Sequence, residues 1–230
     1  MNPTNIIELQ NVHYQIPSDN SILDIIKACD LRVQPHETIA IVGRSGSGKS
    51  TLLSIMAGLE TSTSGQVTLL GKALNDCSED HRAQIRAQQV GFIFQNFQLM
   101  PSMTALENIL MPLELFQIED AEQKALKALE QVGLANRANH RPAELSGGEQ
   151  QRVAIARAFV TEPKVLFADE PTGNLDEETA EQIQSLLLEL NKTLSTTLIL
   201  VTHDNQFAQR CQRVYQLING HLVEKTETDQ

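Results

Sequence analysis

The sequence predicts an α/β fold, and three features of the chain indicate this. A continuous apolar run, Val165 to Ala168, has the pattern of a strand buried on both faces, and Thr197 to Val201 is predicted as one more strand. A third apolar segment, Thr38 to Val42, leads through a glycine-rich turn into a helix-like segment at Thr51 to Ala57, which is the strand–turn–helix order of an α/β unit. With 230 residues and 41% hydrophobic content, the chain suits one such domain with a smaller inserted lobe.

The bulk properties limit the classes of partner and compartment. The formal net charge is −11, and the chain shows no basic stripe of the kind that binds a nucleic-acid duplex. No apolar run approaches the ~20 residues that span a bilayer, and the N-terminus lacks the basic and apolar regions of a signal peptide. Cys29, Cys77 and Cys211 lie far apart without metal-ligand spacing, as in a reducing compartment. We therefore expect a soluble, cytoplasmic chain without a metal site built purely from protein groups.

The N-terminal part is expected to form an antiparallel β layer. Ile6 to Ile16 alternates apolar and polar residues like a half-buried strand. After a turn at Pro17 to Asn20, the β-like character resumes at Ile22 to Val33. Gln66 to Leu70, followed by Gly71, has the pattern of a further strand that ends in a turn.

The middle of the chain is expected to form a helical lobe. Glu79 to Gln88 is a polar helix candidate, and Val90 to Phe94 has the pattern of a buried strand. From Thr104 to about Val132 the pattern is helical, and Gly133 stands where a helix would stop. A long amphipathic helix is predicted at Glu177 to Leu194.

The glycine-rich turn has the pattern of a phosphate-binding loop. The turn and the start of its helix comprise Gly43, Arg44, Ser45, Gly46, Ser47, Gly48, Lys49, Ser50 and Thr51. Glycines let successive N–H groups turn toward an anion, and the helix points its positive dipole end at the same place. Lys49 is expected to contact the β- and γ-phosphates, and the Ser50 hydroxyl to ligate Mg²⁺. The alternative is a turn that merely packs a helix on a sheet; the flanking strand and helix favour a nucleoside triphosphate site.

Two acidic residues follow the central apolar strand. Asp169 and Glu170 stand at its carboxyl end, where open parallel sheets bind ligands. We expect Asp169 to hold the hydration shell of Mg²⁺, and Glu170 to orient or deprotonate the attacking water. A solvent-facing acid pair at a strand end is the simpler alternative.

A Ser-Gly-Gly step precedes a strong helix at Val153 to Phe159. The segment is Leu145-Ser146-Gly147-Gly148-Glu149-Gln150, and such a step into a helix N-terminus can hold an anion. On this segment alone, an ordinary serine cap with glycines that set the turn is an equally good explanation.

Together these motifs resemble those of ATP-binding-cassette (ABC) ATPases over nearly the whole chain. The motifs occur in the same order as in that family: the phosphate loop, Gln95, the Leu145 to Gln150 signature, Asp169-Glu170, Asn174-Leu175-Asp176 and His203. The resemblance implies a P-loop NTPase core of the RecA-like type, an antiparallel β subdomain and an inserted α-helical subdomain. It places the helical subdomain at about 95–160, and the core and β layer at about 1–94 and 161–230.

The resemblance also implies a mechanism. Two chains would pair head to tail around two ATP molecules, each held by one chain's phosphate loop and the other chain's signature. The signature residues that would face the partner's nucleotide are Ser146, Gly147, Gly148 and Glu149. The resemblance makes Glu170, His203 and Gln95 the catalytic group, and it makes Ser50, Gln95 and Asp169 the Mg²⁺ group.

Two residues of this set have rival explanations. Tyr14 resembles the residue that stacks on adenine, whereas a strand-end tyrosine more often only packs. Asp176 belongs to the family's D-loop, and it also stands where an N-cap of the helix from Glu177 belongs.

Three segments resemble one branch of the family, which includes lipoprotein-release, macrolide-export and YbbA-type ATPases, the last most of all. They are Phe94 to Pro101, Glu107-Asn108 and Pro171 to Asp176. The resemblance implies an active ATPase at the inner face of the cell membrane, bound to a separate permease with a large extracytoplasmic domain. Gln95 to Pro101 is the expected docking surface. The alternative is a soluble ABC ATPase acting on nucleic acid or ribosomes, which the single cassette and the acidic balance disfavour.

Overall fold

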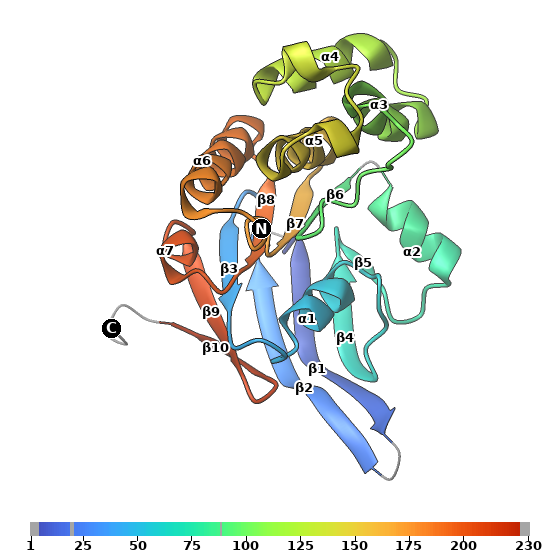
Figure 1. The fold of residues 1–230 in the computed structure, drawn as a ribbon. Coiled ribbons are helices and arrows are strands. Elements are labelled where there is room, and N and C mark those ends of the chain that lie inside the picture. The colour runs from blue at the N-terminus through green and yellow to red at the C-terminus, as the bar shows by residue number, and fades with distance from the viewer. Residues whose placement is uncertain (1–4, 19–20, 88, 226–230) are drawn as a thin grey trace. The chain divides into compact units, whose positions relative to one another are not determined.

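The computed structural model describes residues 5–18, 21–87 and 89–225 (Figure 1). Its internal contacts divide the chain into two compact units. One unit comprises the described residues of Met1–Ala87 and Thr197–Gln230, and the other those of Gln88–Thr196. Within the described residues, no helix is both long enough and apolar enough to cross a membrane.

The first unit contains the expected antiparallel sheet, whose strands lie in the order β2-β1-β4-β5. They are β1 (Ile7–Ser18), β2 (Ser21–Val33), β4 (Ser64–Leu69) and β5 (Lys72–Ala73). In β1, Ile7 and Leu9 are buried while Glu8 between them bonds an exposed arginine. The apolar/polar alternation of the strand therefore determines which face of the sheet is buried. β1 continues through Pro17 and Ser18, where a turn was expected, and the remainder of that turn lies outside the described residues.

The same unit holds a second, mostly parallel sheet in the order β10-β9-β3-β8. Its strands are β3 (Thr38–Val42), β8 (Thr197–Val201), β9 (Arg213–Ile218) and β10 (His221–Glu224). β3 pairs in parallel with β8 and β9, and β10 forms an antiparallel hairpin with β9. The predicted strands at Thr38 to Val42 and Thr197 to Val201 are confirmed, and most of their residues are buried. The sequence pattern predicts neither β9 nor β10.

Three helices belong to this unit: α1 (Lys49–Met56), α2 (Glu79–Arg86) and α7 (Asn205–Ala208). α1 buries Leu52, Leu53 and Ile55, so the residues after the glycine-rich turn form the expected core-facing helix. α2 ends at Arg86, short of the predicted Gln88, which lies outside the described residues.

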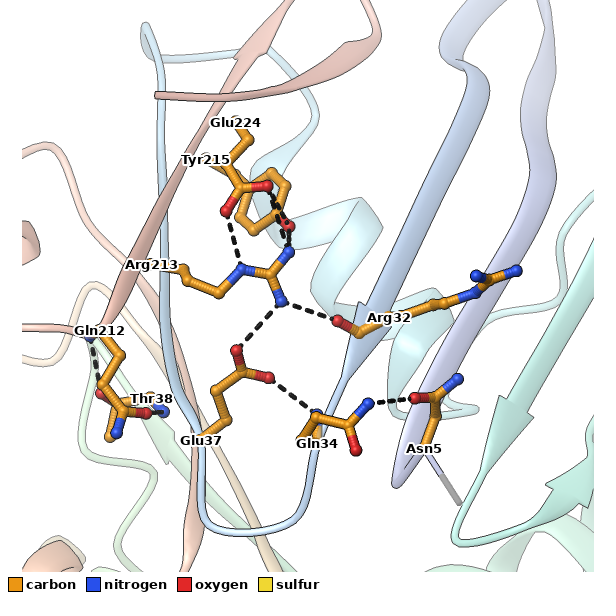
Figure 2. A network of polar contacts seen from close by, with 9 residues as sticks. All are labelled: Asn5, Arg32, Gln34, Glu37, Thr38, Gln212, Arg213, Tyr215 and Glu224. Atoms are coloured by element: carbon orange, nitrogen blue, oxygen red, sulfur yellow. Dashed lines mark hydrogen bonds and ion pairs between the residues drawn. The ribbon is translucent and has the colours of Figure 1, made fainter. Parts of the chain in front are cut away.

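A polar network around Arg213 ties the start of β9 to the turn between β2 and β3 (Figure 2). Nη1 of Arg213 donates to the Arg32 carbonyl oxygen and to Glu37, each at 3.0 Å, and Nε donates to Glu224 at 2.8 Å. The guanidinium also bonds the Tyr215 hydroxyl, whose burial raises its pKa to about 12. At the other end of the hairpin, the Gly220 carbonyl oxygen accepts the N–H of Lys27 in β2 at 2.8 Å. The β9–β10 hairpin is therefore held at both ends (Figure 1).

The three cysteines of this unit differ in exposure. Cys29 is fully buried, and its thiol donates to the Gly220 carbonyl oxygen at 3.3 Å. Cys211 is also buried, which raises its pKa to about 12. Cys77, between β5 and α2, is partly exposed. All three thiols are reduced.

The second unit combines a parallel strand pair, β6 (Val90–Phe94) with β7 (Val165–Asp169), and a group of helices. The helices are α3 (Ala105–Leu115), α4 (Ala121–Gln131), α5 (Gly147–Phe159) and α6 (Glu177–Leu194), with 3₁₀ turns η1 (Ala135–Arg137) and η2 (Pro142–Glu144). α5 contacts α3, α4, α6 and β6, and it is the central helix of the unit (Figure 1). The predicted helix at Glu177 to Leu194 is confirmed at both ends.

The helical pattern from Thr104 to about Val132 is confirmed, and it forms two helices, α3 and α4. The run is broken between α3 and α4, where Gln117 and Asp120 have left-handed φ angles of 54° and 56°. A residue with positive φ cannot continue an α-helix, so two helices replace one. The predicted stop at Gly133 is confirmed, with a φ of 75° just after α4.

Candidate functional site

The phosphate loop of the first unit has the backbone conformation that its glycines predict. Gly46 and Gly48 have φ angles of 76° and 98°, in the left-handed region that side chains disfavour. At Gly48, a Cβ would also lie 2.9 Å from Cγ2 of Ile25, so the position excludes a larger residue twice over. Gly48 is followed at once by α1, whose first amides therefore face the loop.

Two side chains of the loop are arranged to meet an anion. Lys49 is only 7% exposed and folds over the loop, with Nζ donating to the Gly43 carbonyl oxygen at 3.0 Å and to that of Arg44 at 3.2 Å. Oγ of Ser47 is buried, and no described residue offers it a hydrogen-bond partner. A buried hydroxyl without a partner is unfavourable unless a ligand supplies one. The loop therefore has a polar group, the Ser47 hydroxyl, that its own hydrogen bonds do not satisfy and that a bound anion could.

A cavity of about 890 Å³ borders this loop within the same unit. It is lined by part of β2 (Leu23, Asp24, Ile25, Lys27), by the loop (Arg44, Ser45, Gly46, Ser47) and by the β9–β10 hairpin (Gln216, Leu217, Ile218, Asn219, Gly220). This volume lies within the range of small-molecule and cofactor sites, about 300–1,000 Å³. Its lining combines apolar residues with two cations, Lys27 and Arg44, and one carboxylate, Asp24. Because the cations outnumber the carboxylate and the phosphate loop forms one wall, the cavity suits an anionic ligand with an apolar part.

Two further predicted site residues lie in this unit. Tyr14 is on β1 opposite Ile26 and is partly exposed; burial, together with the Glu60 carboxylate, raises the pKa of its hydroxyl. His203 follows β8 and is exposed. The adjoining Asp204 caps α7 by accepting the N–H groups of Gln206 and Phe207.

In the second unit, the acidic pair stands where the sequence predicts it. Asp169 is the last residue of β7, and Glu170 follows with a left-handed φ of 46°. A non-glycine residue in this conformation is uncommon, and functional turns are among the places where it occurs. The turn is held by the Gly173 N–H, which donates to the Glu170 carbonyl oxygen at 3.0 Å. Phe94 pairs with Asp169, so Gln95 and Glu170 both follow directly on paired strand ends.

The signature segment of the second unit begins α5. Oγ of Ser146 accepts the Glu149 N–H at 3.2 Å and the Glu149 carboxylate accepts the Ser146 N–H at 2.8 Å, so the serine is a helix cap as the simpler explanation held. The backbone bond from Ser146, with Arg137 nearby, lowers the pKa of Glu149. A Cβ on Gly148 would lie 2.6 Å from Cγ2 of Thr179 in α6, so this glycine is needed for close helix packing.

Asp176 likewise has the cap role. Its side chain accepts the N–H of Thr179 at 3.0 Å at the start of α6. Before it, Gln95 and Asn174 bond one another: Nε2 of Gln95 donates to Oδ1 of Asn174, and Nδ2 of Asn174 donates to the Gln95 carbonyl oxygen, both at 3.0 Å. The second unit thus brings together Gln95 and the Pro171 to Asp176 turn.

A family model described as ABC transporter matches residues 26–173, which is more than half of the chain. The chain belongs to the ABC transporter family.

Individual relatives agree with this assignment over almost the full length. The ABC transporter ATP-binding protein YbbA of Escherichia coli (strain K12) is 51% identical, with 96% of this chain and 98% of the relative aligned. The lipoprotein-releasing system ATP-binding protein LolD of Legionella pneumophila (strain Lens) is 48% identical, covering 94% and 96%. A dimeric structure of the ATP-binding cassette MJ0796 bound to ADP and Pi superposes with a TM-score of 0.87 at 38% identity, covering 96% and 98%.

As an ABC transporter ATPase, the chain binds and hydrolyses ATP. The expected P-loop NTPase fold and the resemblance to the YbbA and lipoprotein-release branch are confirmed. Sequence reasoning missed Arg157 of α5, which donates to the carbonyl oxygens of Gln98 at 2.7 Å and Phe97 at 3.0 Å. It also missed the β9–β10 wall of the cavity. Arg157 carries no local motif, because its partners are backbone groups about 60 positions away in sequence.

Proposed function

We propose that this chain is the ATP-hydrolysing subunit of an ABC transporter or mechanotransmission complex, and that two copies close around ATP to drive a separate membrane permease. The observation that carries the proposal is the phosphate loop, with left-handed glycines, a buried Ser47 hydroxyl without a partner and Lys49 folded over it. It borders a nucleotide-sized cavity in a chain 51% identical to a transporter ATP-binding protein.

The phosphate loop would hold the nucleotide through main-chain and side-chain donors. The residues are Gly43, Ser45, Gly46, Ser47, Gly48, Lys49, Ser50 and Thr51. On ATP binding, Lys49 would exchange its two carbonyl acceptors for phosphate oxygens, which is favourable because a charge-assisted bond to an anion is stronger than one to a neutral carbonyl. Tyr14 would stack on the adenine.

The donor set on this chain fits Mg²⁺. Ser50 is exposed on the first turn of α1, and Gln95 and Asp169 supply a carboxamide and a carboxylate at the ends of β6 and β7. Mg²⁺ prefers oxygen ligands and is usually held by one or two protein groups together with phosphates and waters. When bound, it would neutralise charge that develops on the phosphate oxygens.

Glu170 would orient or deprotonate the attacking water, and its fixed left-handed turn keeps the carboxylate at the end of β7. His203 would contact the γ-phosphate from the end of β8, and Gln95 would link the metal and water to the helices of its unit. These roles rest on membership of the family and on the position of each residue after a strand.

A second copy would complete each ATP site. The relatives of known structure are described as dimeric, one of them with ADP and Pi bound. Ser146, Gly147, Gly148 and Glu149 would face the partner's nucleotide, at the amino end of α5 where a helix attracts anions. The cap role of Ser146 leaves its hydroxyl able to donate its own proton.

The permease would lie in the membrane and carry an extracytoplasmic domain, and this chain would bind it from the cytoplasmic, inner face. The helical subdomain, about 95–160, would transmit the motion, with Gln95 to Pro101 as the docking surface. Relatives named as a lipoprotein-releasing ATP-binding protein and as a transporter ATP-binding protein support such a partner.

The dimer is tested by size-exclusion chromatography of a Glu170→Gln chain with and without ATP. We expect ATP to convert monomer to dimer, and Ser146→Arg in the same background to abolish the dimer while ATP still binds the monomer. An ATP-induced dimer that survives Ser146→Arg would contradict the assignment of the signature to the interface.

A further inference from the structure

The loop that follows β6 is held by side chains from three different segments of its unit. Arg157 of α5 bonds the carbonyl oxygens of Phe97 and Gln98, both of which have left-handed φ angles, 58° and 49°. Asn108 of α3 is fully buried and bonds both the N–H and the carbonyl oxygen of Met100, at 2.8 and 3.2 Å. The main chain of the loop is therefore fixed by α5 and α3.

Asn174 holds the side chain at the start of this loop. Its Nδ2 donates to the Gln95 carbonyl oxygen and to Oδ1 of Asn96, both at 3.0 Å. Its Oδ1 accepts Nε2 of Gln95, also at 3.0 Å. The preceding Gly173 packs on the same side chain, because a Cβ there would lie 2.8 Å from Nε2 of Gln95.

These bonds determine which end of the Gln95 carboxamide is not bonded to Asn174. A main-chain carbonyl oxygen can only accept, so the NH₂ group of Asn174 must face the Gln95 carbonyl. Oδ1 of Asn174 must then face the Gln95 side chain, and only the NH₂ end of Gln95 can donate to it. Oε1 of Gln95 is directed away from Asn174, and it is the atom that a cation or a water proton requires.

We propose that Asn174 is a positioning residue for Gln95, which selects the rotation of its carboxamide and presents Oε1 toward the metal and water of the bound nucleotide. This rests on the metal role proposed for Gln95. Asn174 lies in the turn between Glu170 and the Asp176 cap of α6, so the orientation of Gln95 is tied to that turn. A shift of the turn on dimer closure would move Gln95, and a metal bond to Gln95 would hold the turn.

The test is Mn²⁺ binding in the presence of ATP, measured by electron paramagnetic resonance in the Glu170→Gln background, where we expect turnover to be slowed by roughly 10²–10⁴. We expect Asn174→Ala and Gln95→Ala each to raise the half-saturating Mn²⁺ concentration by about 3- to 10-fold, the value of one oriented hydrogen bond. The double variant should be no worse than Gln95→Ala alone, because both changes remove the same oxygen from the metal. Asn136→Ala, an exposed asparagine of the same unit, is the matched control and should change nothing.

Hydrogen exchange of the nucleotide-free chain separates positioning from folding. The amides of Phe97, Gln98 and Met100 should keep their protection in Asn174→Ala and lose it in Arg157→Met. Loss of protection in Asn174→Ala, unchanged Mn²⁺ binding in that variant, or additive effects with Gln95→Ala would each overturn the inference while leaving the metal role of Gln95 intact. If Gln95→Ala leaves Mn²⁺ binding unchanged, that metal role and the inference fall together.

Discussion

Replacement of Gly148 by alanine tests whether this signature glycine is required by the single chain as well as by the dimer. A Cβ at Gly148 would lie 2.6 Å from Cγ2 of Thr179, well inside the separation of about 3.5–4.0 Å at which carbon atoms pack. Thr179 is β-branched and sits in the first turn of α6, so it has few other rotamers to adopt. Either α5 and α6 move apart or the threonine is strained.

The expected loss of unfolding free energy is about 1 kcal/mol. Overpacking costs about 1–3 kcal/mol, and the better helix propensity of alanine returns up to about 1 kcal/mol. In a chain of this size the net loss lowers the Tm by about 2–4 °C. Thr179→Ser removes Cγ2 and keeps the hydroxyl. Alone it leaves a small void that costs about 0.5–1 kcal/mol, but in the Gly148→Ala chain it should raise the Tm.

The assay is thermal unfolding of the four proteins without nucleotide, analysed as a double-mutant cycle. Opposite signs for Thr179→Ser in the two backgrounds, with a coupling of about 1–2 kcal/mol, are expected. A Gly148→Ala chain as stable as wild type, or the same sign in both backgrounds, would refute the reasoning. If Gly148→Ala also loses ATP-driven dimers, Thr179→Ser tells whether helix packing is the cause. Thr179→Ser restores only the packing, so dimers that stay lost would point to the contact of Gly148 with the partner.

Three further predictions concern the nucleotide and the polar network. Lys49→Ala should weaken ATP binding about 10- to 100-fold, the value of a charge-assisted bond. An ATP affinity unchanged by calorimetry would contradict the phosphate-binding role of Lys49. Glu170→Gln should cut ATP turnover by roughly 10²–10⁴ with ATP affinity retained, and near-normal turnover would remove Glu170 from its role. The hydrogen bond from Arg213 lowers the pKa of Glu224, so this pair stabilises the fold above pH ~4.5 and loses its effect as pH falls. The Tm advantage of wild type over Glu224→Gln, worth about 0.5 kcal/mol for a partly exposed pair, should stay constant from pH 7 to about pH 5 and shrink as the pH falls below ~4.5. A difference that stays constant well below that pH would exclude this origin.

The sequence predicts those elements whose own residues are apolar enough to require burial. The continuous apolar runs at β3, β7 and β8 can satisfy their side chains only inside a sheet. β9 was not predicted because it begins with Arg213, a charged side chain whose acceptors include Glu37 and Glu224 from other segments. The break at Gln117 was likewise not predicted, since the apolar spacing continues through it.

The site residues also fall into those that local sequence predicts and those that depend on partners distant in sequence. Residues within a motif, such as Lys49 and Glu170, are predicted because the local strand–turn–helix order fixes where they lie. Asn174 and Arg157 could not be assigned a role, because their partners lie about 60–80 positions away in sequence and no sequence pattern indicates them. For Ser146 the sequence pattern fits two roles equally, because a helix cap and an anion site at a helix N-terminus have the same geometry.

The unequal exposure of the thiols makes the wild-type chain suitable for fluorescence work. Maleimide dyes react with accessible thiolates, and both buried cysteines lack that access, with Cys211 further suppressed by its pKa of about 12. Cys77 is the partly exposed one, next to the Ser78 cap of α2 in the unit that carries the phosphate loop. A single dye there, without prior removal of native cysteines, would let energy transfer between labelled copies follow their approach and separation during each round of ATP use.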